Sequence, residues 1–164
     1  AALAEAAGFG VAVAANFNCD GQIVISGESE AVARAGEFCS EKGAKKVVPL
    51  PVAGAFHSPL MDFALPGLKE ALDLTTFSDL SVPLFANVTA EPVESGAQLK
   101  ELLQQQLVGA VRWKQSMERA LEWGAERGIE LGAGKVLMGL MRNISREIKV
   151  YPLESLESIE VFEL

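Results

Sequence analysis

The sequence predicts an α/β fold with a parallel sheet, because strand-like and helix-like segments alternate along most of the chain. Length and composition agree with a globular protein. Of the 164 residues, 49% are hydrophobic and 22% are charged, which is enough apolar content for a real core. Residues 1–50 and 51–164 differ in pattern, and each is expected to form its own unit.

The first unit has the order helix, strand, strand, helix, strand. Asp20 and Gly21 lie between the first two strands, and Asp-Gly supplies the positive φ angles of a tight hairpin. The order matches a ferredoxin-like βαββαβ unit without its first, central strand, so neighbouring strands should have unpaired backbone groups. The expected elements are a helix ending at Gly8, strands at 11–18 and 22–26, a helix at 28–42 and a strand at 46–51.

The second unit begins with Ser58-Pro59, which is typical of a helix N-cap followed by proline at the first helical position. Residues 132–135 (Gly-Ala-Gly-Lys) lack the full Walker spacing and predict a tight turn from strand to helix. The expected elements are a helix from Ser58 to Leu72, a strand at 82–88, helices at 97–107 and 113–127, a strand at 128–131, a helix at 135–147 and a strand at 149–153.

Charge and cysteine content exclude several functions. The net charge of −8 argues against a general nucleic-acid binder. No apolar run approaches 18 residues, so a membrane span is not expected. Cys19 and Cys39 have no CxxC spacing, so neither a disulfide framework nor a metal site is expected. A reducing cytoplasm fits best. Since the chain opens without Met and inside a predicted helix, we expect that an upstream segment has been lost.

The most informative segment is residues 54–61 (Gly-Ala-Phe-His-Ser-Pro-Leu-Met), which holds His57, the single histidine of the chain. His57 stands just before a predicted helix, whose positive N-terminal end should disfavour the imidazolium. A neutral imidazole is what a general base needs near neutral pH. A structural role is the alternative, and position alone does not decide between the two.

Five segments together resemble the malonyl-CoA:acyl-carrier-protein transacylase family, and they occur in the family's order. The resemblance covers residues 3–146. It departs from the family pattern at Asp20, Ala110, Ala133 and Met138, which shape loops. The segments are Ala-Asn-Phe-Asn with Gly-Gln-Ile-Val-Ile-Ser-Gly in 15–27, the histidine segment at 54–61, Asn-Val-Thr-Ala at 87–90, Gln-Leu with Val-Arg-Trp in 106–113, and Glu-Leu-Gly-Ala-Gly-Lys-Val-Leu at 130–137.

The resemblance implies an α/β-hydrolase-like domain with an inserted ferredoxin-like subdomain. Residues 1–50 would be the subdomain without its first strand, and residues 51–164 the C-terminal part of the larger domain. It also implies ping-pong transfer of malonyl from malonyl-CoA to acyl carrier protein, through a serine and without a cofactor. His57 would be the base, oriented mainly by main-chain carbonyls, and Gln106 would support the site.

Further residues are candidates by the same resemblance. Phe56 matches a position tied to acyl selectivity, and an ordinary core aromatic is the alternative. Asn16 and Asn18 would face the acyl pocket, unless they serve only the hairpin turn. A basic cluster is a candidate docking site for the acidic carrier protein, with a solvated helix end as the alternative. That cluster is Lys42, Lys45 and Lys46.

No Gly-x-Ser-x-Gly elbow occurs in the sequence. The chain is therefore interpreted as the C-terminal half of such an enzyme, which needs its missing N-terminal half, is inactive alone, and is marginally stable or prone to aggregation. Three other interpretations of the sequence remain open. The chain is an acyltransferase domain of a polyketide synthase, a non-catalytic remnant that binds acyl carrier protein, or an unrelated α/β domain with chance motifs.

Overall fold

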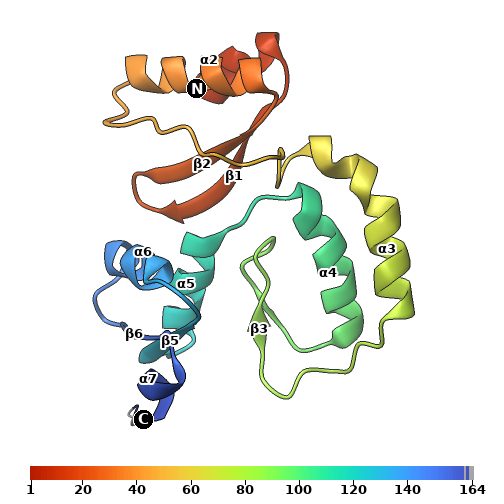
Figure 1. Ribbon diagram of the computed structural model, residues 1–164, viewed down its shortest axis with the longest axis vertical. Coiled ribbons are helices and arrows are strands. Elements are labelled where there is room, and N and C mark those ends of the chain that lie inside the picture. Colours follow the sequence, from red (N-terminus) through yellow and green to blue (C-terminus); the bar gives the residue numbers. More distant parts are fainter. Residues whose placement is uncertain (161, 163–164) are drawn as a thin grey trace.

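The structure is a computed structural model that describes residues 1–160 and 162. It confirms the α/β prediction, and its elements gather in three groups (Figure 1). One group holds the N-terminal hairpin and helices α1 and α2, a second holds α3, α4 and a short hairpin, and a third holds α5, α6 and the C-terminal strands. Within the described residues, the strands form three separate pairs rather than one sheet.

The N-terminal group follows the predicted order up to its last strand. Strands β1 (Ala12–Cys19) and β2 (Gln22–Gly27) form an antiparallel hairpin, and Gly21 takes the positive φ of 78° that the turn requires. Helices α1 (Ala2–Ala6) and α2 (Ser29–Glu41) pack on each other and against this hairpin. The predicted hairpin and both predicted helices of residues 1–50 are therefore present.

The end of the first helix differs from the prediction. Instead of ending at Gly8, the chain continues into the 3-10 helix η1 (Ala7–Phe9), and Gly10 takes the left-handed φ of 125°. The glycine that ends the helical path is therefore two residues later than predicted, because sequence pattern alone does not separate two nearby glycines.

The predicted strand at residues 46–51 is the main error of the fold prediction, since this segment is extended chain without ladder pairing. Four apolar side chains on it and just beyond it are about half exposed. The reason is physical: a strand needs a hydrogen-bonding neighbour, and none of the described strands pairs with this segment. The exposed residues are Val47, Val48, Leu50 and Val52.

The second group begins as the 3-10 helix η2 (Pro59–Ala64), which leads directly into α3 (Leu65–Leu74). Helix α3 lies beside α4 (Gly96–Val108). Along the sequence, the residues that connect α3 to α4 form the short antiparallel pair β3 (Leu84–Phe85) and β4 (Pro92–Val93). The predicted strand at 82–88 is thus reduced to two paired residues. A small core joins this hairpin to α4 through Ala86, Val93 and Leu102.

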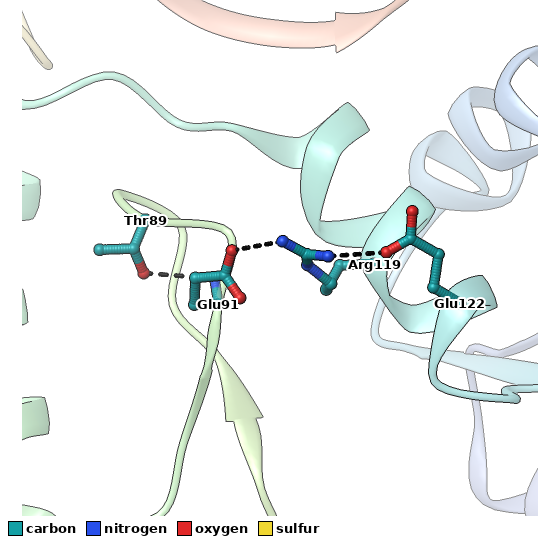
Figure 2. A network of polar contacts seen from close by, with 4 residues as sticks. All are labelled: Thr89, Glu91, Arg119 and Glu122. Carbon is teal, nitrogen blue, oxygen red and sulfur yellow. Dashed lines mark hydrogen bonds and ion pairs between the residues drawn. The ribbon is translucent and has the colours of Figure 1, made fainter.

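An ion-pair network ties this hairpin to α5 (Trp113–Glu122). Arg119 donates to Glu91 of the hairpin at 2.8 Å and to Glu122 of its own helix at 2.7 Å (Figure 2). The main-chain N–H of Glu91 donates in turn to the Thr89 hydroxyl at 3.3 Å. The two carboxylates raise the pKa of the Arg119 guanidinium, mainly through the hydrogen bond to Glu91.

Helix α5 ends five residues earlier than predicted, at Glu122. The main-chain N–H of Gly124 donates to the Leu121 carbonyl, and that of Ala125 donates to the Ala120 carbonyl. This pattern is a Schellman C-cap, and it needs the positive φ of 89° at Gly124. The helix therefore ends at a glycine that the apolar spacing alone did not reveal.

The third group contains the one parallel strand pair among the described residues, β5 (Arg127–Leu131) with β6 (Lys149–Leu153). Helix α6 (Val136–Ile144) connects the two strands, and the short α7 (Leu156–Glu160) follows β6. The prediction of a parallel β-α-β unit is confirmed here, although α6 is shorter than the predicted 135–147. No helix of the described residues is long and apolar enough to cross a membrane.

The accessible surface is large for the size of the chain. It amounts to 10760 Å², whereas a compact monomer of 17.4 kDa exposes roughly 7,900 Å². Many large hydrophobic side chains contribute to this surface. Leu131 on β5, for example, is 75% exposed, and Val136 at the start of α6 is 68% exposed. Surfaces of this kind normally lie against other protein.

Candidate functional site

His57 lies at the end of the exposed loop, directly before Ser58, the residue that precedes η2. Ser58 is the N-cap of η2, as predicted, because its hydroxyl accepts the main-chain N–H of Leu60 at 3.3 Å and Pro59 follows at the first helical position. The histidine therefore stands where an exposed loop becomes a helix that packs on α4.

The imidazole of His57 meets the last turn of α4. Its Nδ1 lies 3.0 Å from the main-chain carbonyl oxygen of Gln106. A carbonyl oxygen only accepts hydrogen bonds, so Nδ1 carries the proton and donates it. The neutral ring then has its lone pair on Nε2, which is the nitrogen free to accept a proton. This is the tautomer that a general base oriented through Nδ1 requires.

The carbonyl of Gln106 is available because it belongs to the last four residues of α4, whose carbonyls have no partner within the helix. The helix end that contacts the ring is therefore a negative C-terminal end, which stabilises a positive charge nearby. The sequence instead suggested the positive N-terminal end of the next helix. Both ends lie close to His57, but the bonded one favours the charge that the ring acquires when it accepts a proton.

The structure thus brings Gln106 to His57, but through its backbone. Within the described residues, the Gln106 side chain makes no hydrogen bond to the imidazole. The resemblance assigned the site role to this glutamine, and it also assigned the orientation of the ring to main-chain carbonyls. In the structure, the main-chain carbonyl next to the ring belongs to Gln106 itself.

The backbone of α4 is in turn held in place by the segment that follows it. The main-chain N–H of Val111 donates to the Ala15 carbonyl of β1 at 2.8 Å, and its carbonyl accepts the N–H of Phe17 at 2.9 Å. The N–H of Arg112 donates to the Asn87 carbonyl at 2.8 Å. These bonds connect the hairpin of β1 and β2 to the segment that follows α4, the helix whose last turn contacts His57.

The other predicted acyl-site residues lie around this junction with less defined contacts. Phe56 precedes His57, is 51% exposed and has its ring against Gly54, where an added Cβ would come within 3.1 Å. Asn16 and Asn18 are half-buried on β1, and Asn16 forms an isolated bridge with Val111. Neither asparagine side chain has a hydrogen-bond partner among the described residues.

The predicted basic cluster is only partly available for docking. Lys42 forms an ion pair with Glu5 at 2.7 Å, and this hydrogen bond raises the pKa of the Lys42 ammonium. Lys45 and Lys46 are exposed on the loop after α2 and have no ion pair within the described part of the chain. The cluster therefore offers two unpaired charges rather than three.

Sequence reasoning missed the role of Glu130. This carboxylate on β5 is 8% exposed, and it accepts the main-chain N–H groups of Leu137 at 2.9 Å and Met138 at 2.8 Å. It thereby caps the start of α6 from the preceding strand. Gly132 and Gly134 take φ angles of 117° and 94°, so residues 132–135 form the tight strand-to-helix turn that was predicted. The signal was the glutamate placed before a Gly-x-Gly turn.

The described residues do not enclose His57. Two open hollows of about 520 and 470 Å³ lie elsewhere, the first beside α3 and α4 and the second beside α6 and β6, and neither is lined by the histidine. No group of three or more potential metal-ligating side chains occurs in the described part of the chain. The histidine therefore has an orienting partner and lines neither of these two hollows.

Curated relatives resemble most of this chain. It is 43% identical over 147 residues to the malonyl CoA-acyl carrier protein transacylase of Bacillus subtilis, covering 90% of this chain and 46% of that protein. The corresponding protein of Escherichia coli K12 is 41% identical over 140 residues, 85% of this chain and 45% of its own length. The chain thus spans about half the length of these relatives. No protein-family model matches it.

Solved structures give the same result for the fold. An acyl-carrier-protein S-malonyltransferase from Bartonella henselae superposes with a TM-score of 0.92 at 42% identity, covering 97% of this chain and 51% of that one. A malonyl-transacylase solved in complex with a type II PKS acyl-carrier protein superposes with a TM-score of 0.93 at 34% identity, covering 97% and 52%. These similarities confirm the family resemblance that the five segments predicted.

Proposed function

We propose that this chain supplies the histidine-bearing half of a malonyl CoA-acyl carrier protein transacylase, because it matches such proteins over about half of their length. The observation that carries the proposal is the bond from His57 Nδ1 to the Gln106 carbonyl. It leaves Nε2 as the acceptor of a proton, in a chain whose relatives carry out acyl transfer.

The proposed reaction has two balanced steps. In the first, a serine of the other half attacks the thioester carbonyl of malonyl-CoA, and His57 Nε2 takes the proton from its hydroxyl. The thioester C–S bond breaks, the coenzyme A thiolate takes that proton from His57, and malonyl-serine remains. In the second, the phosphopantetheine thiol of acyl carrier protein gives its proton to His57 and attacks the ester. The serine oxygen leaves and takes the proton back.

The surrounding residues serve this chemistry in distinct ways. The Gln106 carbonyl and the C-terminal end of α4 stabilise the imidazolium that forms in each step. Phe56 forms a wall that narrows the space beside the malonyl α-carbon. Asn16 and Asn18 face the same space from β1. No cofactor takes part, and the reaction belongs to fatty-acid biosynthesis in the cytoplasm.

We assign residues 1–50 to the ferredoxin-like subdomain and residues 51–164 to the α/β-hydrolase-like domain, both completed by an N-terminal half. The unpaired segment at 46–51 and the exposed apolar residues on β5 support this assignment. Strands of the missing half would pair with residues 46–51 and would cover the exposed apolar residues on β5. By the same argument, the chain alone is catalytically inactive.

The test is a complementation experiment followed by intact-protein mass spectrometry. The chain alone, incubated with malonyl-CoA, should gain no malonyl mass. Mixed with the serine-bearing half of the Bacillus subtilis relative, it should allow that half to gain one malonyl group and then pass it to acyl carrier protein. His57→Ala should abolish the transfer. A malonyl adduct on the chain alone would contradict the proposal, as would full transfer by the His57→Ala mixture.

The acyl carrier protein is the proposed macromolecular partner, and Lys45 and Lys46 are the charges that would steer it. Reversing both in the complemented enzyme should lower the rate of transfer to carrier protein and weaken its dependence on salt. Reversal of Lys42 should do less, because Glu5 already neutralises it. An unchanged, salt-independent rate for the double variant would remove these two lysines from the docking surface.

A second candidate function is supply of malonyl to a polyketide synthase, which the structural neighbour bound to a type II PKS acyl-carrier protein favours. The chemistry at His57 is the same, and only the carrier differs. Comparing the complemented enzyme on a fatty-acid carrier protein and on a type II polyketide carrier protein would distinguish the two. A higher kcat/KM on the polyketide carrier would support the second candidate.

A further inference from the structure

The backbone of His57 adopts an uncommon conformation. Its φ is +60°, and only one other non-glycine residue among those described, Ala90, has a positive φ. Residues other than glycine rarely adopt this left-handed region, although histidine does so more often than most of them. A non-glycine residue stays there only when its surroundings hold it. Something near His57 must therefore stabilise the turn.

Ser58 is the residue that closes this turn. Its side chain is 0% exposed, and its hydroxyl donates to the Ala55 carbonyl at 2.6 Å. Residues 56 and 57 form a tight turn, and the hydroxyl adds a side-chain bond across its ends, from residue 58 to residue 55. The same oxygen accepts the N–H of Leu60 and begins η2. One buried hydroxyl thus fixes both sides of His57.

We propose that Ser58 is a positioning residue for His57, whose hydroxyl holds the left-handed turn that brings Nδ1 to the Gln106 carbonyl. This inference rests on the proposed function, because it concerns the residue assigned there as the base. When the hydroxyl is absent, the backbone of His57 relaxes toward the right-handed or extended regions. Its Cα–Cβ bond then points elsewhere, and the ring loses the carbonyl that selects its tautomer.

The chain offers a direct measurement, because His57 is its one histidine. In a ¹⁵N-labelled sample, the long-range ¹H–¹⁵N spectrum of the imidazole contains a single ring and reports which nitrogen carries the proton. The intact chain should show the Nδ1–H tautomer. Free imidazole side chains in water prefer the Nε2–H tautomer, so loss of the contact changes the pattern from one to the other.

The variants are Ser58→Ala, Ser58→Thr and the control Ser116→Ala. Ser116 is also buried, at 2% exposure, and its hydroxyl donates to the Arg112 carbonyl at 3.0 Å, so it is a second buried serine bonded to a main-chain carbonyl, but within α5. We expect Ser58→Ala to lose the Nδ1–H pattern. Ser58→Thr, which keeps a hydroxyl, should retain it, and so should Ser116→Ala. Circular dichroism checks that each variant keeps its helices.

Four results would overturn the inference. They are a free-imidazole pattern in the unaltered chain, an unchanged Nδ1–H pattern in Ser58→Ala, failure of Ser58→Thr to retain that pattern, and equal loss in Ser116→Ala. If Ser58→Ala does not fold, Ser58→Cys decides: this similar-sized side chain is a weak donor and should lose most of the pattern, and full retention would refute the role of the hydroxyl. The spectrum requires no malonyl transfer. A failed complementation would therefore refute the proposed function and leave this test intact.

Discussion

Glu130→Gln tests the interpretation of the residues 130–137 motif most directly. The carboxylate accepts two main-chain N–H groups at the start of α6, at 2.9 and 2.8 Å, and is almost fully buried. Glutamine keeps one acceptor oxygen and turns its NH₂ group toward the other N–H, which is then left unpaired at about 1–3 kcal/mol. Loss of the negative charge at the helix N-terminus adds about 0.3–1 kcal/mol.

We therefore expect Glu130→Gln to lower the free energy of unfolding by about 1–4 kcal/mol. Urea denaturation followed by circular dichroism measures it, and amide hydrogen exchange of Leu137 and Met138 shows whether the loss begins at α6. Glu126→Gln is the matched control, since Glu126 is exposed on the loop before β5 and makes no polar contact in the described part of the chain. A loss below about 0.5 kcal/mol, which is ordinary for a surface change, would refute the capping role.

Three further predictions follow from the geometry. Gly134→Ala should cost about 1–2 kcal/mol of unfolding free energy, measured by urea denaturation, because an added Cβ meets nothing within 4 Å and only the φ of 94° opposes it; a neutral result would mean that the turn relaxes. Gln106→Ala should leave the Nδ1–H signal of His57 unchanged, because the acceptor is main-chain, whereas a lost signal would show that the side chain orients the ring. Lys100 lowers the pKa of the Asp73 carboxyl through a hydrogen bond, so the pair stabilises the fold above the unfolded pKa of about 3.9 and the contribution is lost as pH falls through the lower folded value. Asp73→Asn should therefore lower the thermal midpoint slightly at pH 7 and not at pH 2, and an equal shift at both pH values would contradict the ion-pair explanation.

Those elements that are stabilised within this chain were predictable from its sequence. The hairpin of β1 and β2 depends on Asp20 and Gly21 between two β-rich runs, and α2 depends on its apolar spacing, so both are local signals. The segment at 46–51 was also predicted as a strand but forms none, and its Pro49 and Pro51 have no N–H to donate to a ladder. Its pairing depends on a neighbour elsewhere, and a pattern that describes side chains does not supply backbone partners.

Part of the candidate site was predictable from the sequence in the same way, and part was not. The histidine itself was predictable, because its residue type and the surrounding segment carry the resemblance. Its acceptor was not, because every residue has a main-chain carbonyl and the one at Gln106 is selected only by where α4 ends. Ser58 was predicted as an N-cap, and that role is real, yet the same hydroxyl also closes the turn across His57. The local role was visible in the sequence, while the role that orients the base became visible only with the sign of φ at His57.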